Sequence, residues 1–110
     1  SKYFVKQMDE CKYSEIHAFL RNRKYPARFD KVKKRAFRRL CQKYVAEDDK
    51  LFYIGKGKKS LVVKGSERAK YIFREFHNIP FGGHPGINKT KQSIGSRFYW
   101  PLMTVDIIKW

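Results

Sequence analysis

Two histidines in the C-terminal half are the residues whose type and spacing best suit a chemical role. His77 and His84 flank a segment rich in proline and glycine, so a tight turn there would bring both rings toward one point. Neutral imidazole is the commonest zinc ligand, and a structural zinc site needs four ligands in a tetrahedron. The pattern therefore indicates half of a zinc site. The alternative is that both histidines simply pack against the fold.

The two cysteines, Cys11 and Cys41, lie far from the histidines and lack the spacing of a zinc-binding pair. Two cysteines do not make a disulfide framework, so we expect reduced thiols. Cys41 is predicted to lie on the apolar face of a helix, as a small core residue. Completion of the zinc site by these cysteines from a distance is a second hypothesis.

Catalytic patterns are absent from the sequence. It has no Ser-His-Asp, Cys-His or paired-carboxylate arrangement that would support nucleophilic or acid–base chemistry. Gly55 and Gly57 lack the context of a phosphate-binding loop and are predicted to be turn residues. His17 is predicted to be an ordinary surface histidine. We expect a chain that is not an enzyme by itself and has no small-molecule substrate.

The charge of the chain indicates a polyanionic partner. Lys and Arg number 26 against 10 acids, which gives +16 over 110 residues, and such a field concentrates nucleic acid. Between Arg21 and Lys43 there are eleven cations and one acid, a net charge of +10. Clustering of one sign on one segment is typical of phosphate binding rather than of solubility alone. Nothing in the sequence distinguishes DNA from RNA.

The N-terminal part is predicted to form two helices. Ser14 is a candidate N-cap for the first, which ends before Pro26 because a proline disfavours the helical conformation in the residue before it. Asp30 is the candidate N-cap of the second helix. Apolar residues recur in the second segment at the helical period: Val32, Ala36, Phe37, Leu40, Cys41, Tyr44 and Val45.

The pattern then changes to strands and back to helices. Residues 51–54 and 60–63 are predicted to pair as a β-hairpin, with 44–46 as a third short strand. A helix capped by Ser66 follows and ends at His77. After the turn, Asn88 is predicted to cap another helix, residues 98–101 to stop it, and a last helical pattern runs to Trp110. No apolar run approaches the roughly 20 residues of a membrane span, so no membrane partner is expected.

From Leu51 onward the chain resembles the N-terminal zinc-binding domain of gypsy-type retrotransposon and retroviral integrases, or of host proteins derived from them. The G-H-x-G and Y-W-P combination is the most specific part. The basic segment before it resembles the N-terminal extension of such integrases. The matching residues are Leu51, Phe52, Gly55, Leu61, Val62, Arg68, Ile72, Glu75, His77, Gly83, His84, Pro85, Gly86, Lys89, Thr90, Ile94, Tyr99, Trp100, Pro101, Met103, Asp106, Ile107 and Trp110.

The resemblance implies a small helical bundle in which two histidines and a later C-x-x-C pair bind one zinc ion. In the family this bundle assists multimerisation and holds DNA ends, and catalysis belongs to a separate domain. His77 and His84 match the family's ligands by position, whereas the cysteine pair has no counterpart here. The family places that pair just after Trp110, so we expect a piece of a longer, nuclear protein that binds zinc in its complete form.

Together these observations predict an α+β fold, in which N-terminal helices and a small antiparallel sheet pack beside an incomplete three-helix bundle. Residues 1–65 form the basic extension and 66–110 the zinc-binding part. The predicted function is non-catalytic DNA binding and assembly. The predicted phosphate contacts are Lys34, Arg35, Arg38, Arg39, Lys89, Lys91 and Arg97. The alternative is a protein-interaction or multimerisation module that uses the aromatic residues around Trp100 and Trp110.

Overall fold

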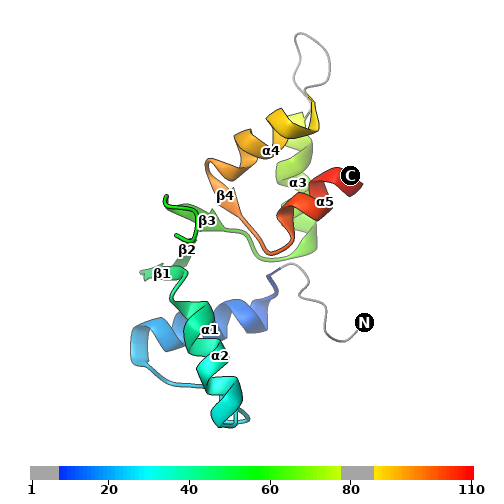
Figure 1. Ribbon diagram of the computed structural model, residues 1–110. Coiled ribbons are helices and arrows are strands. Elements are labelled where there is room, and N and C mark those ends of the chain that lie inside the picture. Colours follow the sequence, from blue (N-terminus) through cyan, green and yellow to red (C-terminus); the bar gives the residue numbers. More distant parts are fainter. Residues whose placement is uncertain (1–7, 78–85) are drawn as a thin grey trace.

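Four strands lie between two groups of helices in the computed structural model, which describes residues 8–77 and 86–110 (Figure 1). The N-terminal group is α1 (Glu10–Asn22) and α2 (Lys31–Cys41). The C-terminal group is α3 (Ser66–His77), α4 (Ile87–Gly95) and α5 (Met103–Lys109). This arrangement confirms the α+β fold class. None of the helices in the described part is long and apolar enough to cross a membrane.

The sheet has four strands, one more than the sequence predicted. Its order is β1 (Tyr44–Glu47), β2 (Lys50–Tyr53), β3 (Ser60–Val62) and β4 (Phe98–Tyr99), with antiparallel pairs except β3–β4, which is parallel. The hairpin and the third strand are confirmed. Residues 98–101 were predicted only as a helix stop, because a two-residue strand has no periodicity of its own. Its pairing depends on distant groups: the Leu61 N–H donates to the Arg97 carbonyl at 2.9 Å.

Two of the predicted helix starts are wrong. Helix α1 begins four residues before Ser14, and Asp9 is its N-cap, accepting a 2.7 Å hydrogen bond from the Lys12 N–H. The N-cap of α4 is Gly86, which offers no side-chain acceptor, and Asn88 already lies inside the first turn. Asp30 is confirmed as the N-cap of α2, accepting from the Lys33 N–H at 2.8 Å. A carboxylate at that position satisfies an N–H that has no partner within the helix.

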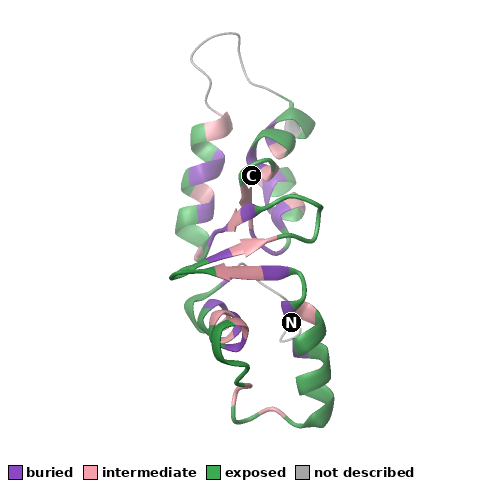
Figure 2. Ribbon diagram, turned by 90° about the vertical axis from the view of Figure 1, so that its left-hand side faces the viewer, coloured by how far each residue is buried: buried purple, intermediate pink, exposed green. Residues whose placement is uncertain are grey.

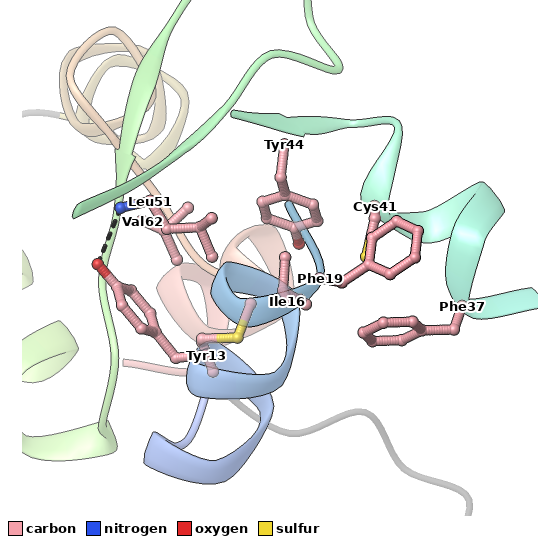
Figure 3. Close-up of a cluster of buried hydrophobic side chains, with 9 residues drawn as sticks. Tyr13, Ile16, Phe19, Phe37, Cys41, Tyr44, Leu51 and Val62 are labelled. Atoms are coloured by element: carbon pink, nitrogen blue, oxygen red, sulfur yellow. Dashed lines mark hydrogen bonds between the residues drawn. The ribbon is translucent and has the colours of Figure 1, made fainter. Parts of the chain in front are cut away.

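The N-terminal core cluster packs α1 and α2 against one face of the sheet. Its centre is rich in aromatic rings, such as Phe19 and Phe37, whose centroids are 5.5 Å apart and nearly perpendicular. The Tyr13 hydroxyl accepts a 2.9 Å hydrogen bond from the Leu51 N–H and so connects α1 to β2 (Figure 3). The cluster comprises Met8, Tyr13, Ile16, Phe19, Phe37, Cys41, Tyr44, Leu51 and Val62.

The C-terminal core cluster begins one residue later in the chain, at Val63. It comprises Val63, Ala69, Ile72, Phe73, Ile94, Trp100, Met103 and Ile107. Val62 and Val63 belong to different clusters because successive side chains of an extended chain point to opposite sides. The predicted division between residues 65 and 66 stays a prediction, and β4 crosses it by pairing with β3.

Candidate nucleic-acid and metal sites

Among the described residues, helix α2 buries side chains only in its C-terminal half. Phe37 and Cys41 are buried and Leu40 is half-buried, whereas every residue from Lys31 to Ala36 is exposed. Val32 and Ala36 thus belong to the predicted apolar period but lie outside the core, and Val32 is 69% exposed. The apolar period thus includes the first turns of α2, where the structure describes no packing partner. The first two turns of α2 extend beyond the core (Figure 2).

The predicted phosphate-binding residues of α2 lie in this exposed helix. Lys34, Arg35, Arg38 and Arg39 are all exposed. The ion pairs within residues 8–77 and 86–110 use other cations, namely Arg28, Lys59 and Lys64. The Lys34 ammonium lies 5.4 Å from the centroid of the Tyr25 ring. The α2 cations are thus available to external anions.

The second predicted group of cations lies on and after α4. Lys89 and Arg97 are exposed and Lys91 is half-buried. The Arg97 guanidinium lies over the rings of Phe76 and Phe98, at 5.9 and 5.5 Å from their centroids. In Figure 1, α2 and α4 lie at opposite ends of a molecule whose longest dimension is 52 Å. The structure therefore does not bring the two predicted groups into one compact patch.

His77 is the described member of the histidine pair, and it ends α3. Its Nδ1 lies 3.4 Å from the Thr90 hydroxyl of α4, and its ring stacks on Phe73 with centroids 5.0 Å apart. Thr90 is 1% exposed, so its hydroxyl faces this histidine rather than a surface ligand. His84 lies outside the described residues.

Residues Trp100 and Trp110 were the basis of the alternative prediction. Trp100 is fully buried, and its Nε1–H donates a 2.9 Å hydrogen bond to the Asp106 carboxylate of α5. Trp110 is half-buried against Phe73 and Trp100. Trp100 is thus a packing residue, and the alternative of an interaction module around Trp100 and Trp110 stays a prediction.

Comparison with known proteins identifies the segment that contains these residues. Residues 65–110 match the family model of the integrase zinc binding domain.

This segment belongs to that family.

The chain is also similar to the Gypsy retrotransposon integrase-like protein 1 of several mammals. The Pongo abelii protein is 38% identical over 79 residues, which are 70% of this chain and 15% of that protein. The Homo sapiens protein is 39% identical over 75 residues, 66% of this chain and 14% of that protein. The chain therefore spans only about 15% of the length of these relatives. No solved structure matches the chain significantly. The integrase zinc-binding domain is a non-catalytic domain.

The described residues alone do not complete the zinc site that the family's name implies. Tetrahedral zinc takes four nitrogen, sulfur or oxygen ligands, and residues 8–77 and 86–110 contain no group of three or more candidate metal ligands. His77 is the one predicted zinc ligand among the described residues. Its position at the end of α3, beside α4, suits a ligand that holds two helices together. The observed donor set does not establish a metal centre.

The two cysteines do not supply the missing ligands in this arrangement. Cys41 is 1% exposed in the N-terminal core cluster, and burial raises the pKa of its thiol to about 11. Cys11 is exposed on α1, and its hydrogen bond to Glu15 raises its pKa. Zinc binds the thiolate form, which both environments disfavour. Both residues are free thiols, as the sequence predicted.

Proposed function

We propose that the chain is a non-catalytic DNA-binding and assembly module of an integrase-like protein, acting in the nucleus. The observation that carries this proposal is the exposed surface of α2, on which Lys34, Arg35, Arg38 and Arg39 have no ion-pair partner among the described residues. The integrase zinc-binding domain that follows supports DNA, rather than RNA, as the polyanion.

The spacing of these cations suits a phosphate backbone. Residues four apart lie on the same side of a helix, roughly 6 Å apart along its axis. Lys34 and Arg38 form one such row, and Arg35 and Arg39 form the next. Each phosphate that the helix neutralises releases condensed counterions, so binding should weaken steeply with salt and depend little on base sequence.

Replacement of Arg35, Arg38 and Arg39 by alanine tests the proposal. We expect weaker binding to a fluorescent DNA duplex, and a plot of log affinity against log salt that flattens by about 0.9 for each lost contact. The matched control replaces Lys70, Arg74 and Lys109, which removes the same charge from α3 and α5. Equal losses in both variants would mean that net charge, and not α2, determines binding.

Zinc binding by His77 and His84 is the second part of the proposal. Support comes from the match to the zinc-binding family and from the place of His77 between α3 and α4. A cobalt(II) titration followed by absorption tests it. We expect His77→Ala to weaken cobalt binding and His17→Ala, a histidine on α1, to leave it unchanged. Equal binding by both variants would contradict the assignment of His77.

Self-association through α5 is the alternative function. The observation that favours it is a row of exposed apolar residues on one side of α5: Leu102 at 49%, Val105 at 57% and Ile108 at 60% exposed. Sedimentation velocity of Val105→Ser/Ile108→Ser against the wild type tests this alternative. A wild-type dimer that the substitutions dissociate, without change in DNA affinity, would separate the two functions.

A further inference from the structure

The second face of the sheet, away from α1 and α2, carries an apolar row, three of whose four residues pack against neither core cluster. Val45, Phe52, Leu61 and Phe98 are paired in register across β1, β2, β3 and β4, one residue from each strand. We call this row the outer sheet row. All four residues are half-buried. Of the four, only Phe98 packs against a core cluster.

A groove continues from this row toward α3. It has a volume of about 330 Å³, and Leu61, Val63, Ile72 and Phe98 are among the apolar residues that line it. The polar side chains that line it are Lys64 and Arg68, both of which are exposed. A volume of this size lies at the lower end of the range for specific ligand pockets. The groove is therefore apolar inside and cationic at its edge.

The cations around the outer sheet row add to this pattern. The Lys59 ammonium lies 4.8 Å from the Phe52 ring centroid, and the Arg97 guanidinium lies 5.5 Å from that of Phe98. Lys59 and Lys64 have carboxylate partners, Glu47 and Glu10, whereas no ion pair of Arg68 or Arg97 occurs among the described residues. An apolar surface with an incompletely paired cationic rim is complementary to apolar side chains flanked by carboxylates.

We propose that the outer sheet row and its groove dock a peptide segment of a partner protein that combines apolar and acidic residues. The apolar side chains enter the groove beside Leu61 and Phe98, and the carboxylates pair with Arg68 and its neighbours. This interaction goes beyond DNA binding, because it uses a different face from the exposed cations of α2.

Two other occupants fit less well. Single-stranded nucleic acid stacks its bases on open aromatic faces, but here cations lie over both phenylalanine rings. Among the described residues that line it, the groove also offers no neutral polar side chain to the edges of a base. A second copy of this chain brings a charge of +16 to a surface that is already cationic. An acidic peptide avoids both conflicts.

Selection from a library of displayed random peptides against the folded chain, in buffer of physiological salt, tests the proposal. We expect the selected peptides to combine Leu, Ile or Phe with Asp or Glu. Two variants report where these peptides bind. Phe52→Thr/Leu61→Thr removes the apolar row while keeping residues that favour strands, and Arg68→Glu reverses the charge at the rim without touching either core.

Synthetic copies of the selected peptides then give affinities by fluorescence anisotropy. We expect Phe52→Thr/Leu61→Thr and Arg68→Glu each to lower the peptide affinity about tenfold or more, since a few central residues dominate such interfaces. Arg35→Ala/Arg38→Ala/Arg39→Ala and Val32→Thr should bind normally, which excludes non-specific attraction to α2. Circular dichroism checks that each variant is folded, and Arg68→Glu keeps the test valid if the double variant is not.

Three results would overturn the proposal. Selection of basic peptides, or of none, would exclude an acidic partner at this face. Peptide binding that depends on α2 but not on the outer sheet row would assign it to net charge. Loss of single-stranded DNA binding, or of a dimer, in the Phe52→Thr/Leu61→Thr variant would assign the face to nucleic acid or to a second copy.

Discussion

The two core clusters differ in what they contribute. All of the C-terminal cluster except Val63 lies in the segment that matches the family model, and its side chains are internal: Trp100, Met103 and Ile107 are buried. The N-terminal part carries the exposed cations of α2, and it lies outside the match to the family model. The segment that matches the family model thus contains one of the two cores, whereas the surface proposed to contact DNA lies on α2, outside that segment.

The largest expected effect would come from removing the centre of the C-terminal cluster. Trp100→Ala should lower the free energy of unfolding by about 3–5 kcal/mol, because it creates a cavity in a closed core. Urea unfolding followed by circular dichroism measures this loss, with the exposed Val105→Ala as control. Hydrogen exchange at Ile16 would show whether the N-terminal cluster survives. Simultaneous loss of protection there would mean that the two clusters form one cooperative unit.

An intermediate effect is expected at the contact between α1 and β2. Tyr13→Phe keeps the ring but removes the hydroxyl that accepts from the Leu51 N–H. A buried donor that loses its acceptor costs about 1–3 kcal/mol. The same urea titration measures this change. A change below half a kilocalorie would show that water replaces the hydroxyl, and that the rings alone connect α1 to the sheet.

Alkaline pH should destabilise the protein through groups of the N-terminal core cluster, namely Cys41 and Tyr44. Burial raises the pKa of Cys41 from 9.0 to about 11, so the folded state keeps a proton that the unfolded state loses. Stability from this group is complete below pH 9 and falls as pH rises toward 11. Burial also raises the pKa of Tyr44, which extends the fall to higher pH.

Cys41→Ala should remove the first part of this pH dependence. Thermal melts between pH 8 and 11 measure it, and Cys11→Ala, at an exposed thiol, is the matched control. Equal pH dependence in the wild type and in Cys41→Ala would assign the alkaline loss to tyrosines or to lysines instead.

The smallest effect is expected at Val32. Its substitution by serine should change the free energy of unfolding by no more than about 0.5 kcal/mol, the usual range for exposed positions. Phe37→Ala, on the covered half of the same helix, provides the contrast. A large loss at Val32 would mean that the first turns of α2 are covered in solution, and the proposed DNA surface would then need revision.

Local patterns predicted the fold class, the hairpin and the confirmed cap at Asp30, because each depends on neighbouring residues. The exposure of Val32 was not predictable, since periodicity defines an apolar face but not how much of it a neighbour covers. Strand β4 was missed because its two residues pair through Leu61, far away in sequence. The outer sheet row was missed for the same reason: Phe52 and Phe98 become neighbours only once the strand order is known.

Among the candidate cations, Lys34, Arg35, Arg38, Arg39 and Lys89 are exposed on helices, Lys91 is half-buried and Arg97 follows α4. The sequence could not place α2 relative to α4. That separation is a property of the tertiary fold. His77 was placed correctly at a helix end, since the amphipathic pattern of α3 stops there. Its contact with Thr90 was not predictable, because it depends on how α3 and α4 pack. The roles of these residues in binding stay predictions.

Because β3 and β4 are far apart in sequence, we expect their pairing to come late when the chain folds during synthesis. The buried residues of the N-terminal core cluster end at Val62, so most of that cluster can assemble before β4 is made, although Tyr99 of β4 also packs against it. One edge of β3 then stays unpaired until residues 98 and 99 have been synthesised. An open strand edge can pair with another chain. The interval before β4 arrives is therefore when this protein is most vulnerable to misassembly, and slower translation of α4 would lengthen it.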